Sequence, residues 1–307
     1  MIADVRTAEF PDEPWDPPST ISWYAEPDQV WSRFRCLAGE EVVGFAAAHH
    51  NPWSVADDGF VWLVLGFFPA HRTGANLAAA IAFLEGQARG ESGRTSITNA
   101  REDDTVLLAV LDELGYAEER RDRYWELDLI GRRASLLEMA ERSRERMRRQ
   151  GITLTTLAAD ADPEKYRKLH AVSSEGELDV PTTATNVPPS LERLMEMLDE
   201  PSTHKDRVWI ARIGEDLAGL SMLGFPVERG IVATDWTAVA RAHRNRGIAR
   251  ALKLETVVQA IELGVERVRT DNDSTNSPIL RLNEELGYRR VFDRLALTRS
   301  LESTSQP

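Results

Sequence analysis

Cysteine is nearly absent from this 307-residue chain, which contains only Cys36. A single cysteine excludes a disulfide framework and a cysteine-based zinc site, and the six histidines show no HExxH-like arrangement. We therefore expect no metal. The chain also lacks an apolar run as long as a membrane span, and its first residues do not have the layout of a signal peptide. These absences predict a cytoplasmic protein that does not associate with membranes.

Positive charge is in short supply as well. The formal net charge is −13 and the sequence pI is near 5.1. A nucleic-acid-binding protein needs a basic surface, so this class is disfavoured, whereas a cationic small-molecule substrate is weakly favoured. The length and the 42% hydrophobic content suit two globular domains. We expect a monomer or a homodimer.

The sequence contains an internal repeat. Short matches recur in the same order, each 172 positions further along the chain: Ala70–Arg72 as Ala242–Arg244, Thr98 as Thr270, and Glu113–Tyr116 as Glu285–Tyr288. Three ordered matches at one offset indicate two copies of one fold.

Each copy follows the same predicted order of elements. Apolar alternation predicts three successive strands, which are followed by a long helix, a strand, a shorter helix and a final strand. In the second copy the long helix covers about 247–263 and the final strand covers 291–298. The first copy shows this order from Val30 to Leu129, after an acidic, proline-rich segment that replaces the opening strand and most of the first helix. The pattern predicts an α/β (α+β) fold class with a mixed sheet.

We expect four segments in the chain. The first copy forms an N-terminal domain over 1–130, and the second copy forms a C-terminal domain over 151–300. Residues 131–150 combine many Arg and Glu with spaced apolar residues, which predicts an amphipathic linker helix whose arginines are solvated or paired with glutamates. Residues 301–307 form a tail.

The stretch 244–249, Arg-Asn-Arg-Gly-Ile-Ala, is the most informative part of the sequence. It follows a β-branched run and opens the long helix of the second copy. The start of a helix has unpaired N–H groups and the positive end of the helix dipole, so it is a favourable site for an anion. Gly247 and Ala249 keep the turn slim, and Arg244 and Arg246 supply positive charge. The stretch therefore predicts a phosphate-binding turn.

The Arg-x-x-Gly-x-Ala pattern at 244–249 is followed by Leu-Gly-Tyr at 286–288, ten positions after Asn276. This pair of motifs, with the order of elements, resembles the GNAT N-acetyltransferase superfamily. The two copies resemble tandem GNAT proteins of the mycothiol synthase kind. The resemblance implies two tandem GNAT folds, acetyl-CoA as cosubstrate, a small-molecule amine as acceptor and direct transfer within a ternary complex.

The resemblance also implies roles for single residues. The backbone of 237–239 would pair with the pantetheine arm, and the N–H of Val239 would stabilise the charge that develops on the thioester oxygen. Asn276 would face the pantetheine or thiol end, or would instead cap the following helix. The implied cofactor-contacting residues are Thr237, Ala238, Val239, Arg244, Asn245, Arg246, Gly247, Ile248, Ala249, Asn276 and Asn283.

An acceptor amine is mostly protonated at neutral pH, so the reaction needs a base. Asp235 lies on the same predicted strand as Val239 and has the same side-chain parity, so both are expected to face the cleft, with Asp235 as the base. Asp235 could instead bind nearby backbone. Glu175 and Glu177, in the loop that covers the acceptor site in this family, are the alternatives for the base or for ammonium recognition.

Position 283 departs from the family pattern. The family commonly has a Tyr there that protonates the leaving thiolate, whereas Asn283 can only donate an amide hydrogen bond to the sulfur. The general acid is therefore unassigned. This departure supports one alternative function, a non-catalytic acyl-CoA-binding or regulatory protein. A transferase that uses another acyl donor or a mycothiol-type amine is a second alternative.

The first copy departs much further from the motifs. At the common offset, Ala75, Leu77, Asp104 and Leu111 stand where the second copy has Gly247, Ala249, Asn276 and Asn283. Bulk at the turn and a carboxylate near the thiol end both oppose acetyl-CoA binding, although Gly74 would restore the turn after a slip of one residue. We expect a mainly structural first domain that helps to shape the acceptor pocket, and an active site in the second domain.

Overall fold

The computed structural model describes residues 1–302, which form two compact units. Unit 1 contains Met1–Arg123, Thr182–Val187 and the segment that begins at Phe292. Unit 2 contains Tyr124–Pro181 and Pro188–Val291. No helix among the described residues combines the length and the apolar character that crossing a membrane would require.

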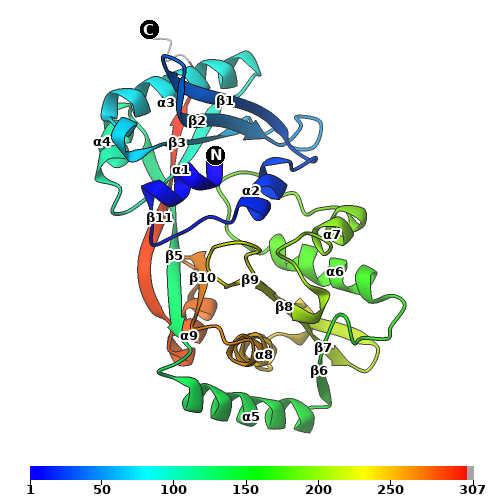
Figure 1. Cartoon of the computed structure of the whole chain (residues 1–307). Helices are drawn as coiled ribbons and strands as arrows, with labels where there is room; N and C mark the ends of the chain where they lie inside the picture. Colours follow the sequence, from blue (N-terminus) through cyan, green and yellow to red (C-terminus); the bar gives the residue numbers. More distant parts are fainter. Residues whose placement is uncertain (303–307) are drawn as a thin grey trace. The chain divides into compact units, whose positions relative to one another are not determined.

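Unit 1 is built on a sheet with the strand order β1-β2-β3-β4-β11 (Figure 1). From the sequence we expected the opening strand and most of the first helix to be missing. The structure has no strand before β1, but it has two helices there. Leu77, Ile81 and Leu84 of α3 are buried in its core. The elements are α1 (Ile2–Glu9), α2 (Pro17–Tyr24), β1 (Val30–Ala38), β2 (Glu41–His50), β3 (Phe60–Phe67), α3 (Gly74–Gly90), β4 (Thr95–Arg101) and α4 (Thr105–Glu113).

Unit 2 has the strand order β5-β10-β9-β8-β7-β6. The helices α6 and α8 pack on opposite faces of its strands β8 and β9 (Figure 1). The elements are β5 (Ala117–Asp128), α5 (Arg133–Arg149), β6 (Ile152–Thr156), α6 (Lys165–Glu177), α7 (Leu191–Met197), β7 (Val208–Ile213), β8 (Asp216–Gly224), β9 (Ala233–Val239), α8 (Ile248–Glu262), β10 (Arg267–Asp273) and α9 (Ser277–Leu286). The chain then enters β11 (Arg289–Ser300), whose residues from Phe292 onward belong to unit 1.

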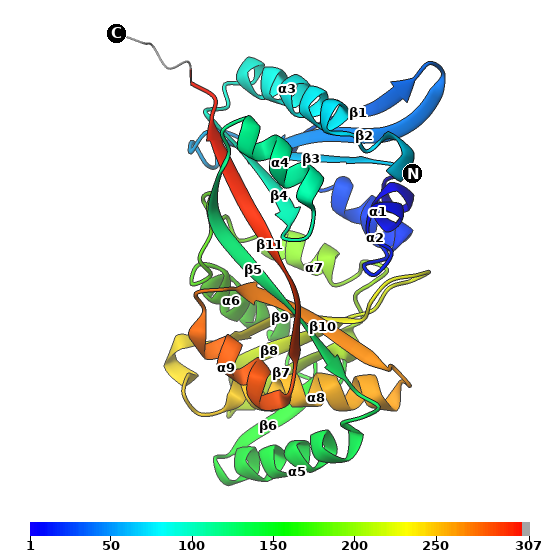
Figure 2. The same cartoon turned by 90° about the vertical axis from the view of Figure 1, so that its left-hand side faces the viewer.

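The last strand of each repeat lies in the sheet of the other unit. β11 pairs antiparallel with β4 from Arg294/Arg101 to Ser300/Thr95, and Figure 2 shows the two strands side by side. The side chains of Leu295, Leu297 and Leu301 lie in the core of unit 1. In the same way, Trp125 and Leu127 of β5 lie in the core of unit 2. Compact units therefore do not coincide with the contiguous ranges 1–130 and 151–300 that we expected.

The expected elements are otherwise present within a few residues of their predicted ends. The linker helix is α5, and the long helix of the second copy is α8. Leu301 is buried in unit 1, so it does not belong to a tail. Residues 303–307 of the expected tail lie outside the described residues.

Candidate functional site

The 244–249 turn joins the end of β9 to the start of α8. Gly247 has φ +86°, in the left-handed region that glycine adopts without strain, and Asn245 also has a positive φ of 62°. Gly247 is the residue before α8, and its carbonyl accepts the first helical hydrogen bond from the N–H of Ala251 at 3.1 Å. The following N–H groups at the start of α8 therefore face the turn, as an anion site requires.

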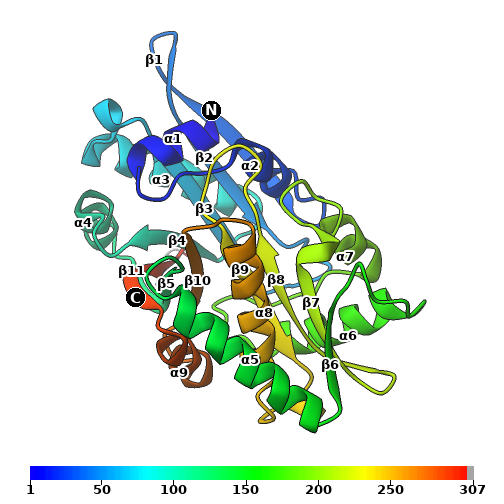
Figure 3. The same ribbon diagram turned by 60° about the horizontal axis from the view of Figure 1, so that its bottom comes forward.

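The linker helix α5 lies beside this turn, and Figure 3 shows α5 and α8 as neighbours in unit 2. A Cβ atom on Gly247 would lie 3.2 Å from Cζ of Arg146, so this guanidinium covers the glycine. Arg246 also faces α5, because its Nε donates to Oε1 of Gln150 at 3.3 Å. Our expectation that the linker arginines are solvated or paired with glutamates holds for Arg142 and Arg149. The periodicity gave no signal for the place of Arg146.

Near its end, β9 points the peptide groups of alternate residues away from β8. The N–H of Ala240 donates to the carbonyl of Ala218 at 3.0 Å, and alternate residues of a strand point their N–H groups to opposite sides. The N–H groups of Thr237 and Val239 therefore point toward the side of β10. Parallel pairing with β10 has its register at Ala233/Arg269, near the start of β9. Ala238 points its peptide groups toward β8, so they are paired within the sheet, and its contact with the pantetheine arm stays a prediction.

A β-bulge separates Asp235 from Val239. Trp236 pairs with Met222 and Thr234 pairs with Leu223, so Asp235 is the extra residue of β9. An extra residue reverses the alternation of side chains. The side chain of Val239 packs with the α8 face, whereas the Asp235 carboxylate lies on the face of α6. The expectation that these two side chains share one face is therefore wrong.

The Asp235 carboxylate lies against Gly224, where any Cβ atom would collide with it. The Asp235 side chain is exposed to solvent on one side, although protein atoms crowd around its carboxylate. This crowding removes part of the surrounding water and, followed by the negative charge of Asp271, raises the pKa of Asp235 to about 7. Arg269 of β10 is the register partner of Ala233 of β9. Asp271 and Asp235 each lie two residues further along these parallel strands, so the two acids are neighbours. We had not selected Asp271 from the sequence.

Part of the chain matches a known protein family. Residues 177–288 match the model of the acetyltransferase (GNAT) family. This segment is a GNAT acetyltransferase domain. It contains the bulge, the 244–249 turn and the helix α9, but none of the corresponding parts of the first copy.

Solved structures with the same fold cover nearly the whole chain. A tandem GNAT protein from the clavulanic acid biosynthesis pathway, solved without AcCoA, is 18% identical with a TM-score of 0.74, over 99% of this chain and 94% of that one. A GCN5-related N-acetyltransferase from Sphaerobacter thermophilus is 17% identical with a TM-score of 0.67, over 98% and 92%. A GNAT-family acetyltransferase from Colwellia psychrerythraea is 11% identical with a TM-score of 0.62, over 98% and 96%. No curated protein sequence matches the chain. The fold is that of tandem GNAT proteins.

Asn283, where the GNAT pattern commonly has Tyr, is fully buried. Its Oδ1 accepts a hydrogen bond from Nζ of Lys253 at 3.0 Å, and its Nδ2 donates to Oδ1 of Asn272 at 2.7 Å. The side chain therefore connects α8, α9 and β10 and offers no exposed amide to a ligand, so the structure gives its expected contact with the CoA sulfur no support. Asn276 is the residue before α9, but its half-buried side chain makes no capping hydrogen bond.

Glu175 and Glu177 lie in the last turn of α6 and not in the loop where we expected them, and their surroundings differ. Oε2 of Glu175 accepts a hydrogen bond from the N–H of Arg241 at 3.0 Å, so Glu175 binds the segment that leads into the 244–249 turn. Burial raises the pKa of Glu177, whose carboxylate lies 3.5 Å from the hydroxyl of Ser173. These contacts do not make Glu175 or Glu177 a better candidate than Asp235 for the catalytic base.

In unit 1, the counterparts of Val239 and Arg244 bind a carboxylate of the chain itself. The N–H of Phe67, 172 positions before Val239, donates to Oε1 of Glu9 at 3.0 Å. Arg72, 172 positions before Arg244, donates from Nε to the same oxygen at 2.9 Å and also forms an ion pair with Asp104. The side chain of Glu9 is only 1% exposed. The first helix of the chain therefore supplies a buried carboxylate to the groups of unit 1 that correspond to Val239 and Arg244.

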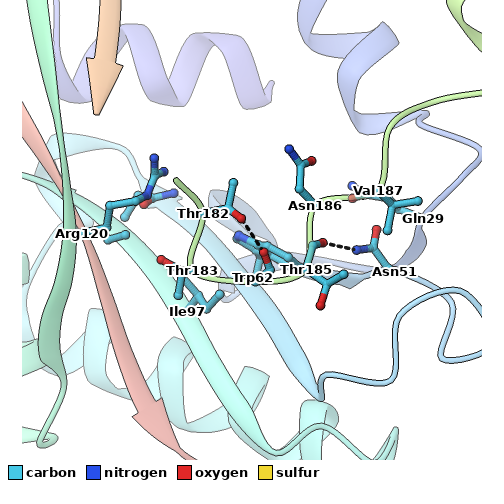
Figure 4. Close-up of a pocket in the computed structure, with 13 residues that line it drawn as sticks. Gln29, Asn51, Trp62, Ile97, Arg120, Thr182, Thr183, Thr185, Asn186 and Val187 are labelled. Atoms are coloured by element: carbon cyan, nitrogen blue, oxygen red, sulfur yellow. Dashed lines mark hydrogen bonds between the residues drawn. The ribbon is translucent and has the colours of Figure 1, made fainter. Parts of the chain in front are cut away.

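The loop between α6 and α7 contributes Thr182–Val187 to unit 1. The N–H of Thr185 donates to Oδ2 of Asp58 at 2.7 Å, and Ala184 is buried against Ile97. Figure 4 shows these loop residues around a pocket of about 220 Å³, with Trp62 and Arg120 among the residues that line it. This part of the loop is thus held by unit 1.

Lys253 provides a test of the buried network around Asn283. Burial lowers the pKa of Lys253 to about 7, whereas an unfolded lysine has a pKa near 10.4. Between these values the unfolded state binds more protons, so the folded state gains stability as the pH rises. We predict that the stability of the wild type relative to Lys253→Met increases by about 1.4 kcal/mol per pH unit between pH 7.5 and 9.

Urea unfolding of both proteins at the two pH values measures this change. Lys205→Met is the control, because Lys205 forms an exposed ion pair with Asp199 at 2.5 Å and its pKa is raised rather than lowered. A difference between wild type and Lys253→Met that does not change with pH would contradict the assignment.

Proposed function

We propose that the chain is an acetyl-CoA-dependent N-acetyltransferase that acts on a small-molecule amine by direct transfer within a ternary complex. The active site is in unit 2. One observation carries the proposal. In unit 2 the left-handed Gly247 and the outward N–H of Val239 are arranged as the GNAT cofactor site requires, whereas the equivalent N–H in unit 1 already binds Glu9.

Residues of unit 2 fit the cofactor. The N–H groups at the start of α8, together with Arg244 and Arg146, would hold the pyrophosphate. The peptide groups of Thr237 and Val239 would orient the pantetheine arm along the open edge of β9. Acetyl-CoA, when bound, supplies the acetyl group as a thioester. Asn276 stays a candidate for the thiol end.

Two groups would act on the reacting atoms. The N–H of Val239 would donate a hydrogen bond to the carbonyl oxygen on which negative charge develops. Asp235 would accept the proton that the attacking amine loses. A base with a pKa near 7 is half deprotonated at neutral pH and still accepts a proton readily. Asp271 would raise the affinity of Asp235 for that proton and would attract a cationic acceptor.

Asn283 does not replace the tyrosine acid of the family pattern. Asn283 is buried and is bound to Lys253, so the proton for the leaving thiolate would come from water. The same observation favours the second candidate function, a GNAT protein that binds acyl-CoA without turnover. Thiol release distinguishes the two functions.

We expect the protein to release free thiol from acetyl-CoA in the presence of at least one member of a panel of small primary amines. Gly247→Glu places a side chain in the left-handed turn and a negative charge beside the phosphates. It should raise the KM for acetyl-CoA on the order of 100-fold, equivalent to about two charge-assisted hydrogen bonds. The assay is release of thiol, detected with a chromogenic disulfide.

The matched control is Gly74→Glu, which places the same side chain in the first turn of α3 in unit 1. A Cβ atom there meets only Cγ2 of Val110 at 3.5 Å, so the KM should change about twofold or less. Unaltered turnover in Gly247→Glu would contradict the site, and binding of acetyl-CoA without thiol release would select the second function.

The pH dependence tests the base. Asp235 must be deprotonated to accept a proton, so kcat/KM should fall as the pH decreases through about 7. Asp235→Asn should lower kcat/KM by about 10²- to 10⁴-fold and remove this limb. Asp271→Asn removes a like charge, so it should keep the limb but move it to lower pH.

The measurement is the pH–rate profile of the three proteins with one amine. An unchanged acidic limb in Asp235→Asn would exclude Asp235 as the base. A limb that moves to higher pH in Asp271→Asn would show that the two carboxylates are not coupled as described.

A further inference from the structure

Arg244, the first residue of the 244–249 turn, is bound to acceptors of the chain itself. Its Nη2 lies 2.5 Å from Oδ2 of Asp179, and its Nε donates to the carbonyl of Val239 at 3.0 Å. Asp179 also binds Arg241, with Nη2 of that arginine 2.5 Å from Oδ1 and Nε 3.1 Å from Oδ2. One carboxylate therefore spans two guanidinium groups at the turn.

This carboxylate has the chemistry of the ligand that the turn is proposed to bind. Carboxylates and phosphates both accept paired hydrogen bonds from arginine. The hydrogen bonds from Arg241 and Arg244 lower the pKa of Asp179 to about 2, so Asp179 is ionised at every physiological pH. The carbonyl of Val239, which Arg244 covers, belongs to the edge of β9 that would orient the pantetheine arm. Asp179 and Arg244 together thus occupy two parts of the proposed cofactor path.

The ion pair of Asp179 is exposed and exchangeable, unlike its counterpart in unit 1. The side chains of Arg244 and Asp179 are 39% and 30% exposed. Those of Arg72 and Glu9 are 14% and 1% exposed. An exposed ion pair contributes little to stability, so a better-placed anion can replace it, whereas breaking a buried one is costly.

We propose that Asp179 is an internal competitor for Arg244 that the pyrophosphate of acyl-CoA displaces, which releases the start of the loop between α6 and α7. The proposal rests on the proposed cofactor site in unit 2. Asp179 lies two residues after the end of α6, and the loop is next held at Thr182–Val187 in unit 1. Release of Asp179 would therefore leave residues 178–181 without their hold on the turn. Cofactor would bind before the acceptor.

Asp179→Asn removes the competing charge with almost no change of shape. We expect it to bind acetyl-CoA about 3- to 10-fold more tightly than the wild type, as measured by calorimetric titration. The control is Asp199→Asn, the same substitution at an exposed ion pair with Lys205, which should leave the affinity unchanged. Asp179→Ala checks that the effect does not depend on the new amide.

S-Acetylpantetheine, which lacks the pyrophosphate, is the second probe. It should bind wild type and Asp179→Asn equally, because it cannot compete for Arg244. In the wild type, saturating acetyl-CoA should also speed amide hydrogen exchange at 178–181, and Asp179→Asn should show fast exchange before ligand is added.

Three outcomes overturn the proposal. The first is an unchanged or weaker affinity for acetyl-CoA in both Asp179 variants with an unchanged melting temperature. The second is an equal gain for S-acetylpantetheine. The third is an exchange rate at 178–181 that falls on binding in the wild type. A wild type that binds no acetyl-CoA would instead refute the proposed function itself.

Discussion

The contact between an arginine and a carboxylate at the start of a helix sets the difference between the two copies of this fold. Arg72 and Arg244 occupy the same position of the repeat, yet Arg72 is bound by the nearly buried Glu9 and Arg244 by the exposed Asp179. Removing one partner of a buried pair costs about 3–5 kcal/mol, whereas an exposed pair contributes about 1 kcal/mol or less. We therefore propose that a phosphate competes for Arg244 and not for Arg72. The rest of the proposed site depends on this difference.

Unit 1 differs from unit 2 at the equivalent position. Its own helix α1 supplies the carboxylate that binds the counterparts of Val239 and Arg244, and its sheet is completed by β11 from the other repeat. It also holds Thr182–Val187, the middle of the loop whose beginning is bound at the 244–249 turn by Asp179. We propose that unit 1 has a mainly structural role and binds no cofactor.

Local patterns predicted most of the elements, because apolar periodicity and glycine or proline at their ends are local properties. The repeat and the turn at Gly247 were found in this way. The side-chain direction in β9 could not be predicted in this way. The extra residue Asp235 reverses the alternation of side chains, and the sequence pattern does not show that it is an extra residue. The exchange of β5 and β11 depends on which strands meet in space, which no single segment encodes.

The site residues divide along the same line. Gly247 was predictable because its conformation is a local requirement. Arg146, Asp271 and Glu9 were not, because each reaches its position through packing of a separate element. Asn283 is the opposite case. Its motif position suggested a cofactor contact, but the side chain is buried and accepts a hydrogen bond from Lys253.

The number of acetyl-CoA molecules bound per chain tests the central claim most directly. Calorimetric titration, with hydrogen exchange to locate the protected amides, measures it on the intact protein. We predict one molecule per chain, with protection at 237–252 and none at 65–80. Two molecules per chain, or protection confined to 65–80, would contradict it.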